Sequence, residues 1–364
     1  MTNICFLLGG FQGNGGIGRV TSILVNKLCE NPDLNISTIS YCQKNQPMLY
    51  KLSDKITTHH LFDSSIPMTK AILTKHVIKK IKNIVKKENI DILIACGALF
   101  YPVSILACRG TKAKCFCWEH TDPTMGHDHK FQDICRRFAI KRCHKMIVLT
   151  KSAERFYLDN LHILADKLCQ IYNPISESSD DAAQYNAESK KIISVGRLSY
   201  QKNFEGLVEI ASKVLPRHPD WTWDIYGEGD YRDMLTEKIE QNGLVGKVNL
   251  MGQVNDLYDR YKNYAFMIMT SRYEGFPMAL LEGGSNRLPL VSYDIKTGPD
   301  EIIEDGKNGF LIDFEDKEKM IERIEQLISD SDLRKSMSDT SYDMIHKFKM
   351  DDIIEKWNEV FKKG

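Results

Sequence analysis

The sequence predicts an α/β protein made of two Rossmann-like domains. Short apolar or β-branched runs alternate with longer helical patterns along the whole chain, which is typical of βαβ units and parallel sheets. The alternation breaks once, at residues 173–190. The chain has 364 residues, which is too long for one small core and suits two domains of ordinary size.

Strands are predicted at the short runs, and helices between them. In the first half of the chain the runs are ICFLL, ISTIS, ILIAC, KCFCW and MIVLT. In the second half they are IISVG, WDIYG, VNLMG, FMIMT, LVSYD and GFLI. The stretch between the halves has few large apolar residues and many Ser, Asp, Ala and Asn, which is typical of a linker. We therefore predict domains at 1–172 and 173–345, followed by a C-terminal helix over 346–364.

The composition predicts a globular protein of the cytoplasm. Hydrophobic residues make up 42% and charged residues 27%, and no apolar run approaches the roughly 20 residues of a membrane helix. The ten cysteines are scattered, which favours free thiols in a reducing compartment. Residues 1–172 carry 24 Lys and Arg against 13 Asp and Glu, whereas the rest carries 25 against 36. This split predicts that the first domain meets an anionic partner.

A glycine-rich stretch, FQGNGGIGRV, follows the first apolar run. Its glycines form a G-x-G-x-x-G pattern, which in dinucleotide-binding folds cradles a pyrophosphate. Two features disagree with that assignment: GGFQ separates the glycines from the strand, and the second strand ends in Cys42-Gln43-Lys44, without an acid for the ribose. A loop that holds another phosphate compound and a plain glycine-rich turn both remain open.

The stretch SRYEGFPMALLEGG (271–284) predicts an anion site. Glu274 follows the buried run FMIMT, and Pro277 suits the first turn of a helix because its missing N–H is not needed there. The N–H groups from Met278 onward would point at a diphosphate. Glu282, one turn further, would accept two hydrogen bonds from a ribose diol. A solvated glutamate at each place is the alternative, and the strand–Gly–Pro–helix context argues against it.

The stretch IISVGRLSYQKN (192–203) predicts two cations at the end of a strand. Arg197 follows Gly196 directly, and Lys202 precedes a helical pattern. Two cations there would neutralise the charge of a leaving diphosphate. A surface salt bridge is the alternative for either residue alone.

Taken together, these residues resemble the retaining glycosyltransferases of the GT-B fold, family 4. EGFPMALLE resembles the E-x7-E signature of that family, and SVGRLSYQKN resembles its Arg and Lys diphosphate clamp. YGEGDYRDML, MGQVNDLYDRY and GPDEIIEDGKNGFLI resemble further blocks, so the match covers nearly all of 190–312. In the first half the resemblance rests on GGIG and WEHT. It is strongest to bacterial enzymes that build cell-surface polysaccharides.

The resemblance implies two Rossmann-like domains that face each other across a cleft. The first domain offers the acceptor, the second holds the nucleotide-sugar donor, and the C-terminal helix over 346–364 crosses back to the first. The implied catalytic residues are Glu274, Arg197, Lys202 and His120. The implied nucleotide-sugar-binding residues are Gly15, Gly16, Gly196, Val254, Gly275, Phe276, Met278, Ala279 and Glu282. One departure concerns Arg287, where relatives usually have Gly. Here Asn286 is the residue expected to cap the helix in the left-handed conformation.

His120 lies at a predicted strand end in CFCWEHTDP. The resemblance implies that it contacts the donor sugar, and a satisfied structural histidine is the alternative. A metal site is not expected: GHDHK, with Cys135, Cys143 and His144 nearby, matches no standard zinc spacing. Cys115 and Cys117 share one strand face and are expected to pack. No cofactor is predicted beyond the substrate nucleotide sugar.

The first half also carries a lysine-rich stretch between residues 70 and 87. Its apolar residues Leu73, Val77, Ile81 and Ile84 recur at helical spacing, and a second basic cluster follows in RRFAIKRCHK. A basic amphipathic helix predicts peripheral contact with an anionic membrane. An ordinary core-facing helix with a solvated lysine face is the alternative. Nucleic acid is not expected as a partner, because no aromatic residues interleave with the basic ones.

The function expected from this resemblance is transfer of a sugar from a UDP-sugar, with retention and without a metal. The acceptor would be a lipid-linked or lipopolysaccharide-type glycan, at the cytoplasmic face of the membrane. Three alternatives remain open: a sugar-nucleotide epimerase of similar fold, a teichoic-acid-type glucosyltransferase, and a non-catalytic binding relative.

Overall fold

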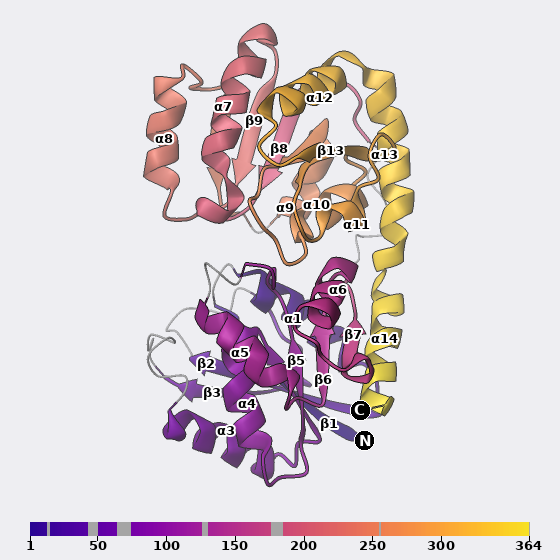
Figure 1. The fold of residues 1–364 in the computed structure, drawn as a ribbon. Helices are drawn as coiled ribbons and strands as arrows, with labels where there is room; N and C mark the ends of the chain where they lie inside the picture. The colour runs from indigo at the N-terminus through magenta and orange to yellow at the C-terminus, as the bar shows by residue number, and fades with distance from the viewer. Residues whose placement is uncertain are drawn as a thin grey trace. The chain divides into compact units, whose positions relative to one another are not determined.

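The structure is a computed structural model, and its description covers residues 1–12, 15–42, 50–63, 74–125, 130–175, 185–254 and 256–363. The chain divides into two compact units (Figure 1). Unit 1 contains Met1–Pro174 and Met350–Gly364, and unit 2 contains Ile175–Lys349. The sequence places the corresponding boundaries at residues 172/173 and 345/346.

Unit 1 is built on a seven-stranded parallel sheet of order β3-β2-β1-β4-β5-β6-β7. Its strands are β1 (Thr2–Leu8), β2 (Leu34–Cys42), β3 (Thr57–Phe62), β4 (Ile92–Cys96), β5 (Lys114–Trp118), β6 (Lys145–Val148) and β7 (Leu168–Gln170). Its helices are α1 (Gly16–Leu28), α3 (Lys75–Lys87), α4 (Tyr101–Cys108), α5 (Lys130–Ile140), α6 (Lys151–Asp159) and α14 (Met350–Lys363).

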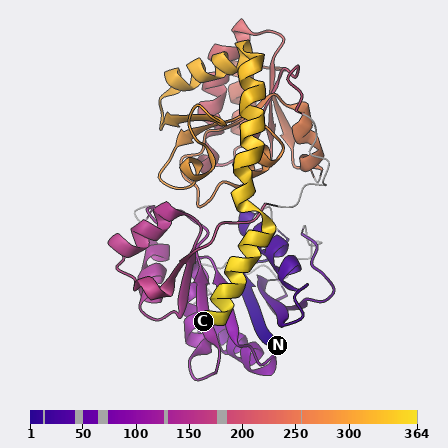
Figure 2. The ribbon, with the colours of Figure 1, turned by 90° about the vertical axis from the view of Figure 1, so that its right-hand side faces the viewer.

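The two faces of this sheet are covered by different helices, because side chains alternate along each strand. On one face, strand residues such as Leu7 and Cys115 join a core with α3, α4 and α5. These three helices lie side by side, α3 against α4 and α4 against α5. On the other face, Phe6 and Trp118 pack against Trp357 of α14, whose helix runs along the unit in Figure 2.

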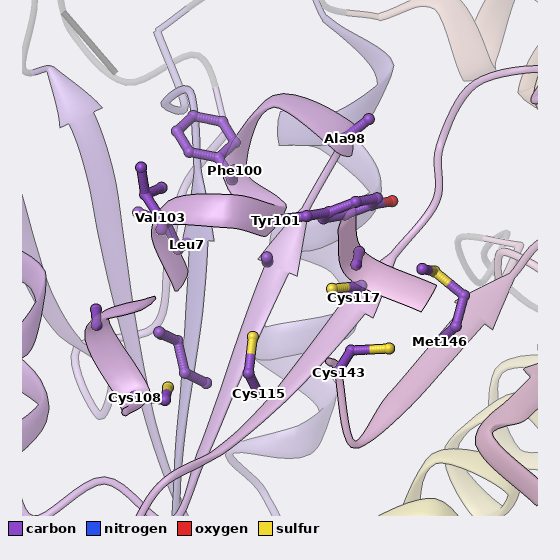
Figure 3. Close-up of a cluster of buried hydrophobic side chains, with 14 of the residues drawn as sticks. Leu7, Ala98, Phe100, Tyr101, Val103, Cys108, Cys115, Cys117, Cys143 and Met146 are labelled. Carbon is purple, nitrogen blue, oxygen red and sulfur yellow. The ribbon is translucent and has the colours of Figure 1, made fainter. Parts of the chain in front are cut away.

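Figure 3 shows the first of these cores, with Cys115 and Cys117 among buried side chains of β1, α4 and β6. All ten cysteines are free thiols. The expectation that Cys115 and Cys117 pack is therefore confirmed.

Unit 2 is built on a six-stranded parallel sheet of order β10-β9-β8-β11-β12-β13. Its strands are β8 (Lys191–Val195), β9 (Thr222–Tyr226), β10 (Val248–Gly252), β11 (Phe266–Met269), β12 (Leu290–Asp294) and β13 (Gly309–Asp313). Its helices are α7 (Phe204–Val214), α8 (Arg232–Gln241), α9 (Leu257–Arg260), α10 (Met278–Ser285), α11 (Pro299–Ile302), α12 (Lys317–Ser329) and α13 (Ser331–Ile345). Two Rossmann-like units are thus confirmed.

Every strand that the sequence predicts is present, and the described part of the chain contains two strands, β3 and β7, that were not predicted. β3 contains two adjacent histidines and β7 has only three residues, so neither forms a clear apolar run. The predicted linker needs correction at its ends. Asn173 and Ile175 are buried, and the Ser189 hydroxyl donates to the Asn263 carbonyl at 2.6 Å. Residues 176–184 of that stretch lie outside the described residues.

The strand order of each sheet shows where a ligand-binding crevice is expected. In each sheet the first strand lies inside, with the next strand on one side and a later strand on the other: β1 lies between β2 and β4, and β8 lies between β9 and β11. Such a switch point opens a crevice at the carboxyl ends of parallel strands, where ligands of α/β folds bind.

Candidate functional site

The switch point of unit 2 brings together the residues that the sequence singled out. Arg197 and Lys202 follow β8, and Glu274 follows the neighbouring strand β11. Because both strands are parallel, their carboxyl ends lie at the same sheet edge. Val254 follows β10 at this edge too, two strands further along the sheet, and is half-buried.

The β8 loop is fixed by close backbone packing against the β9 loop. The Gly196 N–H donates to the Tyr226 carbonyl at 2.9 Å, and the Leu198 N–H donates to the Glu228 carbonyl at 3.1 Å. Gly227 has φ +139, and a Cβ there would lie 1.9 Å from the Gly196 carbonyl oxygen. The glycine at this position therefore allows the two loops to touch, and this contact sets the path of the chain into Arg197.

Glu274 is the centre of a buried polar cluster. Its Oε1 lies 2.5 Å from the Lys202 Nζ and accepts a hydrogen bond from the Ser271 hydroxyl at 2.7 Å. Its Oε2 accepts from the Gln201 Nε2 at 3.2 Å. The Thr297 hydroxyl donates to the Glu274 main-chain carbonyl. Glu274 is only 7% exposed, so the carboxylate is held in one orientation.

Lys202 and Glu274 are therefore in direct contact, a pairing that the sequence did not predict. Neither Ser271 nor Gln201 was singled out from the sequence. Ser271 is three residues before Glu274 in the same motif, and Gln201 precedes Lys202, so proximity in the motif was the only available signal.

Arg197 contrasts with Lys202. Its side chain is exposed, and within the described part of the chain it has no ion pair. An exposed, unpaired guanidinium beside a paired ammonium leaves one cation ready for an anionic ligand. The pair of cations that the sequence predicted is therefore present, but only one of them lacks a protein partner.

The helix α10 begins at Met278, one residue later than the sequence suggested. Pro277 is the residue before the helix, with φ −79 and ψ 91, rather than its first helical residue. The Leu280 N–H donates to the Pro277 carbonyl at 3.0 Å, while the first N–H groups of a helix have no partner within it. Met278 and Ala279 therefore form the helix N-terminus expected from the sequence. In the turn before the helix, Gly275 is half-buried and Phe276 is buried.

Glu282 lies inside α10 and is buried at 2% exposure. Its Oε2 accepts a hydrogen bond from the Tyr261 hydroxyl at 3.0 Å. Tyr261 was not identified from the sequence, because its contact with Glu282 spans two elements. This bond orients the second glutamate of the motif.

The end of α10 corrects one sequence prediction. Asn286 has φ −96, so it is not left-handed, and Arg287 takes that conformation instead with φ 63. The Leu288 N–H donates to the Gly283 carbonyl at 2.9 Å, as in the usual glycine-type helix ending. The Arg287 guanidinium lies 4.1 Å from the centre of the Tyr342 ring, so its side chain stacks on that ring.

In unit 1, the loop after β1 leads into α1. Gly15 is the residue before the helix, with φ −81, and Gly16 is its first residue. A Cβ on Gly16 would meet none of the described residues within 4 Å. Gly13, which belongs to the same glycine pattern, lies outside the described residues.

His120 follows β5 in unit 1 and is half-buried. Its ring packs on Trp118, with ring centres 4.1 Å apart. The Nε2 atom is buried and has no hydrogen-bond partner among the residues that the structure describes. Burial lowers the pKa of His120 to about 3, so the ring is neutral near pH 7.

The residue before His120 anchors a buried network that the sequence analysis missed. Glu119 lies 2.6 Å from the Arg136 guanidinium of α5, and both side chains are 1% exposed. The Tyr157 and Thr121 hydroxyls each donate to the Glu119 carboxylate at 2.8 Å. Arg136 was assigned to a surface basic cluster, and this is wrong, because its charge is fully buried against Glu119. The arginine pair lowers the pKa of Glu119 to about 2, against the opposing effect of burial.

Among the described residues, no group of three or more His, Cys, Asp or Glu side chains is arranged to hold a metal ion. His127, Asp128 and His129 of the GHDHK stretch lie outside the described residues. No helix in the described part of the chain has the length and apolarity that crossing a membrane requires.

The helix α3 shows how the lysine-rich stretch is used. Val77, Ile81 and Val85 of this helix are buried in the core of unit 1. The Lys80 and Lys82 ammonium groups donate to the main-chain carbonyls of Leu61 and Arg109, each at 2.6 Å. The apolar face of α3 is thus occupied by the core. Lys70 and Leu73 lie outside the described residues.

Two family models match the chain, and together they span most of it. Residues 15–179 match the model described as Glycosyltransferase Family 4, and residues 176–344 match the model described as Glycosyl transferases group 1. The first covers most of unit 1, and the second covers most of unit 2.

Curated relatives cover the chain from end to end. An uncharacterized glycosyltransferase of Haemophilus influenzae is 25% identical over 99% of this chain and 100% of its own length. The amylovoran biosynthesis glycosyltransferase AmsD of Erwinia amylovora is 26% identical over 99% of both chains. Among solved structures, a mutant of S. aureus TarM in complex with Fondaparinux, alpha-GlcNAc-glycerol and UDP matches with a TM-score of 0.82 at 17% identity, over 99% of this chain and 100% of that one. This match shows the shared GT-B fold.

Proposed function

Because the chain belongs to the GT-B glycosyltransferases, with a family 4 domain followed by a group 1 domain, we propose that it transfers a sugar from a UDP-sugar to a glycan acceptor. The proposed transfer is retaining and needs no metal. The proposed acceptor is a lipid-linked or lipopolysaccharide-type glycan in cell-surface polysaccharide biosynthesis. A teichoic-acid-type acceptor is the alternative.

The Lys202–Glu274 pair carries this proposal. A buried carboxylate with three fixed donors sits beside two cations and a helix N-terminus, all at the switch point of one sheet. A diphosphate needs the cations and the helix N–H groups, while sugar hydroxyls need a carboxylate that accepts hydrogen bonds. A nucleotide sugar combines both groups in one molecule. The UDP in the TarM complex supports uracil as the base.

The proposed chemistry follows from where the charge develops. The bond between the anomeric carbon and the diphosphate oxygen breaks, and the acceptor oxygen forms a new bond on the same face of the sugar. The acceptor proton passes to an oxygen of the leaving diphosphate. Arg197, Lys202 and the α10 N-terminus stabilise the growing negative charge, which is why no metal is required in this proposal.

The remaining residues have supporting roles in this proposal. Glu282, oriented by Tyr261, accepts from the ribose hydroxyls, and Val254 lies toward the base. Glu274 accepts from hydroxyls of the donor sugar. In unit 1, the neutral His120 contacts the donor sugar through Nε2, and the backbone at Gly15 and Gly16 faces substrate. In support, a Cβ on Gly16 would meet no described residue within 4 Å.

A panel of nucleotide sugars tests the proposal. We expect slow release of UDP from one UDP-sugar without acceptor, and none from GDP- or CMP-sugars. With a glycan acceptor, NMR of the anomeric proton should show the same configuration in donor and product. Lys202→Ala serves as the control: release of UDP that persists in this variant would come from a contaminating enzyme rather than from this site. Isomerised donor without release of UDP would instead show an epimerase, and no turnover of any donor would show a binding protein.

A further inference from the structure

The helix α5 of unit 1 has an exposed face with apolar side chains at its centre. Phe131 is 38% exposed and Ile134 is 62% exposed, while Phe138 is half-buried. These residues follow one another at spacings of three and four, so they lie on one face of the helix. Large apolar side chains grouped on a surface in this way mark an interaction site.

Exposed cations surround these apolar side chains. Lys130 and Arg137 lie on the helix, and Lys141 and Arg142 follow directly after its end. The Arg142 guanidinium lies 4.4 Å from the centre of the Phe138 ring, which joins a cation to the apolar group. The one acidic residue of the helix is Asp133, which pairs with Arg137 at 2.8 Å.

The opposite face of α5 is fixed to the core of unit 1. Cys135 and Ala139 are buried there, and Arg136 forms its fully buried ion pair with Glu119. Breaking such a pair leaves an uncompensated charge in the interior. The helix therefore cannot rotate to hide its apolar residues, and their exposure is a built-in feature of the fold.

The neighbouring helices add positive charge but little apolar surface. The apolar residues of α3 face the core, and its exposed residues are polar or charged, with lysines such as Lys75, Lys79 and Lys86 among them. The helix α4 lies between α3 and α5, carries no acidic residue and exposes Leu106. This side of unit 1 thus combines a broad positive field with one apolar centre, on α5.

We propose that the exposed face of α5, made of Lys130, Phe131, Ile134, Arg137, Phe138, Lys141 and Arg142, docks on an anionic lipid bilayer. The cations bind lipid phosphates, and Phe131 and Ile134 enter the boundary between head groups and acyl chains. Charge complementarity selects the bilayer as the occupant. A purely polyanionic partner would match the cations but would leave the exposed aromatic and aliphatic side chains in water.

This inference goes beyond the proposed function, because vesicle binding needs no donor turnover. The sequence predicted membrane contact through the lysine-rich stretch that contains α3. Because the apolar face of α3 is buried in the core, the proposed contact is through α5 instead. The placement is also useful to a transferase with a lipid-linked acceptor: α5 begins ten residues after His120, and Arg136 of α5 holds the residue next to that histidine.

Sedimentation with vesicles tests the docking face. The vesicles contain phosphatidylglycerol and phosphatidylcholine, with pure phosphatidylcholine as the uncharged reference. The triple change Arg137→Gln, Lys141→Gln, Arg142→Gln should weaken binding about 100-fold at low salt, since each cation near an anionic surface contributes about 1 kcal/mol. The double change Phe131→Ser, Ile134→Ser should weaken it at least about tenfold, because side chains that enter the bilayer are lost.

A matched control uses the rival helix. Lys75→Gln, Lys79→Gln, Lys86→Gln removes the same number of charges from α3 and should weaken binding much less than the α5 triple does. Equal or larger loss from the α3 variant would overturn the assignment to α5. Wild-type protein that ignores phosphatidylglycerol vesicles would overturn it as well.

A further variant tests membrane contact through a new fluorescence signal rather than through weaker vesicle binding. Ile134→Trp should show blue-shifted emission with anionic vesicles, and brominated acyl chains should quench it. Vesicle binding that depends on the cations but not on Phe131 and Ile134, with no quenching, would favour a polyanionic partner and contradict the bilayer. Analytical ultracentrifugation covers the remaining occupant: a dimer that Phe131→Ser, Ile134→Ser dissociates would identify the face as a contact between copies.

Discussion

The ammonium group of Lys202 lies 2.5 Å from the carboxylate of Glu274, although 72 residues separate them in the chain. Each residue follows a different strand of the unit 2 sheet, and the contact exists because β8 and β11 are neighbours. Ser271 and Gln201 hold the same carboxylate from two directions. The pair is therefore one preorganised unit, and the predictions below begin with it.

We expect Lys202→Met and Glu274→Gln to act on sugar transfer in a non-additive way. Each single change should lower turnover about 10²–10³-fold, the usual cost of one lost group that stabilises charge at an active site. Because each residue positions the other, the double variant should be at most about tenfold slower than the worse single variant. Steady-state kinetics of the four proteins measure this coupling. Losses that simply multiply would show independent roles.

Glu282→Ala should weaken binding of free UDP by about 1.5–3 kcal/mol, as expected for a lost charged hydrogen bond. Tyr261→Phe removes only the hydroxyl that orients Glu282, and should weaken UDP much less. Isothermal titration calorimetry measures both affinities. Unchanged UDP affinity in Glu282→Ala would rule out the ribose role.

The buried Glu119–Arg136 ion pair should contribute far more to the free energy of unfolding than the exposed Asp133–Arg137 ion pair of the same helix. Arg136→Met leaves Glu119 charged and buried, which should cost about 3–5 kcal/mol in free energy of unfolding. Arg137→Ala removes an exposed partner of Asp133 and should cost about 0.5 kcal/mol or less. Urea denaturation of both variants makes the comparison. Similar losses would mean that burial does not determine the effect of these two arginines.

Stability should fall with acid partly because of His120. Its pKa is about 3 in the folded chain, whereas an unfolded histidine titrates near 6.5. The unfolded state therefore binds the extra proton between these values, so this contribution is complete above pH 6.5 and is lost as the pH falls toward 3. His120→Gln should flatten the dependence of the urea midpoint on pH between 7 and 5.

The exposed His162 of the same unit provides the control for that experiment. His162→Gln makes the same substitution at an exposed position and reports what the substitution alone does to the urea midpoint. If His120→Gln follows the wild-type curve, the His120 ring is not held neutral by the fold.

The sequence alone was enough to predict two parallel sheets, most of their strands and the residue types of the site. Runs such as FMIMT and IISVG indicate buried strands because they alternate with longer helical patterns, and the Gly-Phe-Pro turn before MALLE indicates a helix start to within one residue. β3 and β7 escaped this reasoning, since short or polar strands are held by their neighbours rather than by their own pattern.

Which charges meet depends on the packing of the folded chain, and the sequence did not reveal it. Arg136 and Arg137 are adjacent in the sequence, yet one is buried against Glu119 and the other is exposed, because the helix turns 100° between them. Both α3 and α5 have apolar residues at helical spacing. The apolar face of α3 is buried in the core, whereas Phe131 and Ile134 of α5 are exposed to solvent. Local pattern sets the faces of a helix, and packing decides which of these faces is covered.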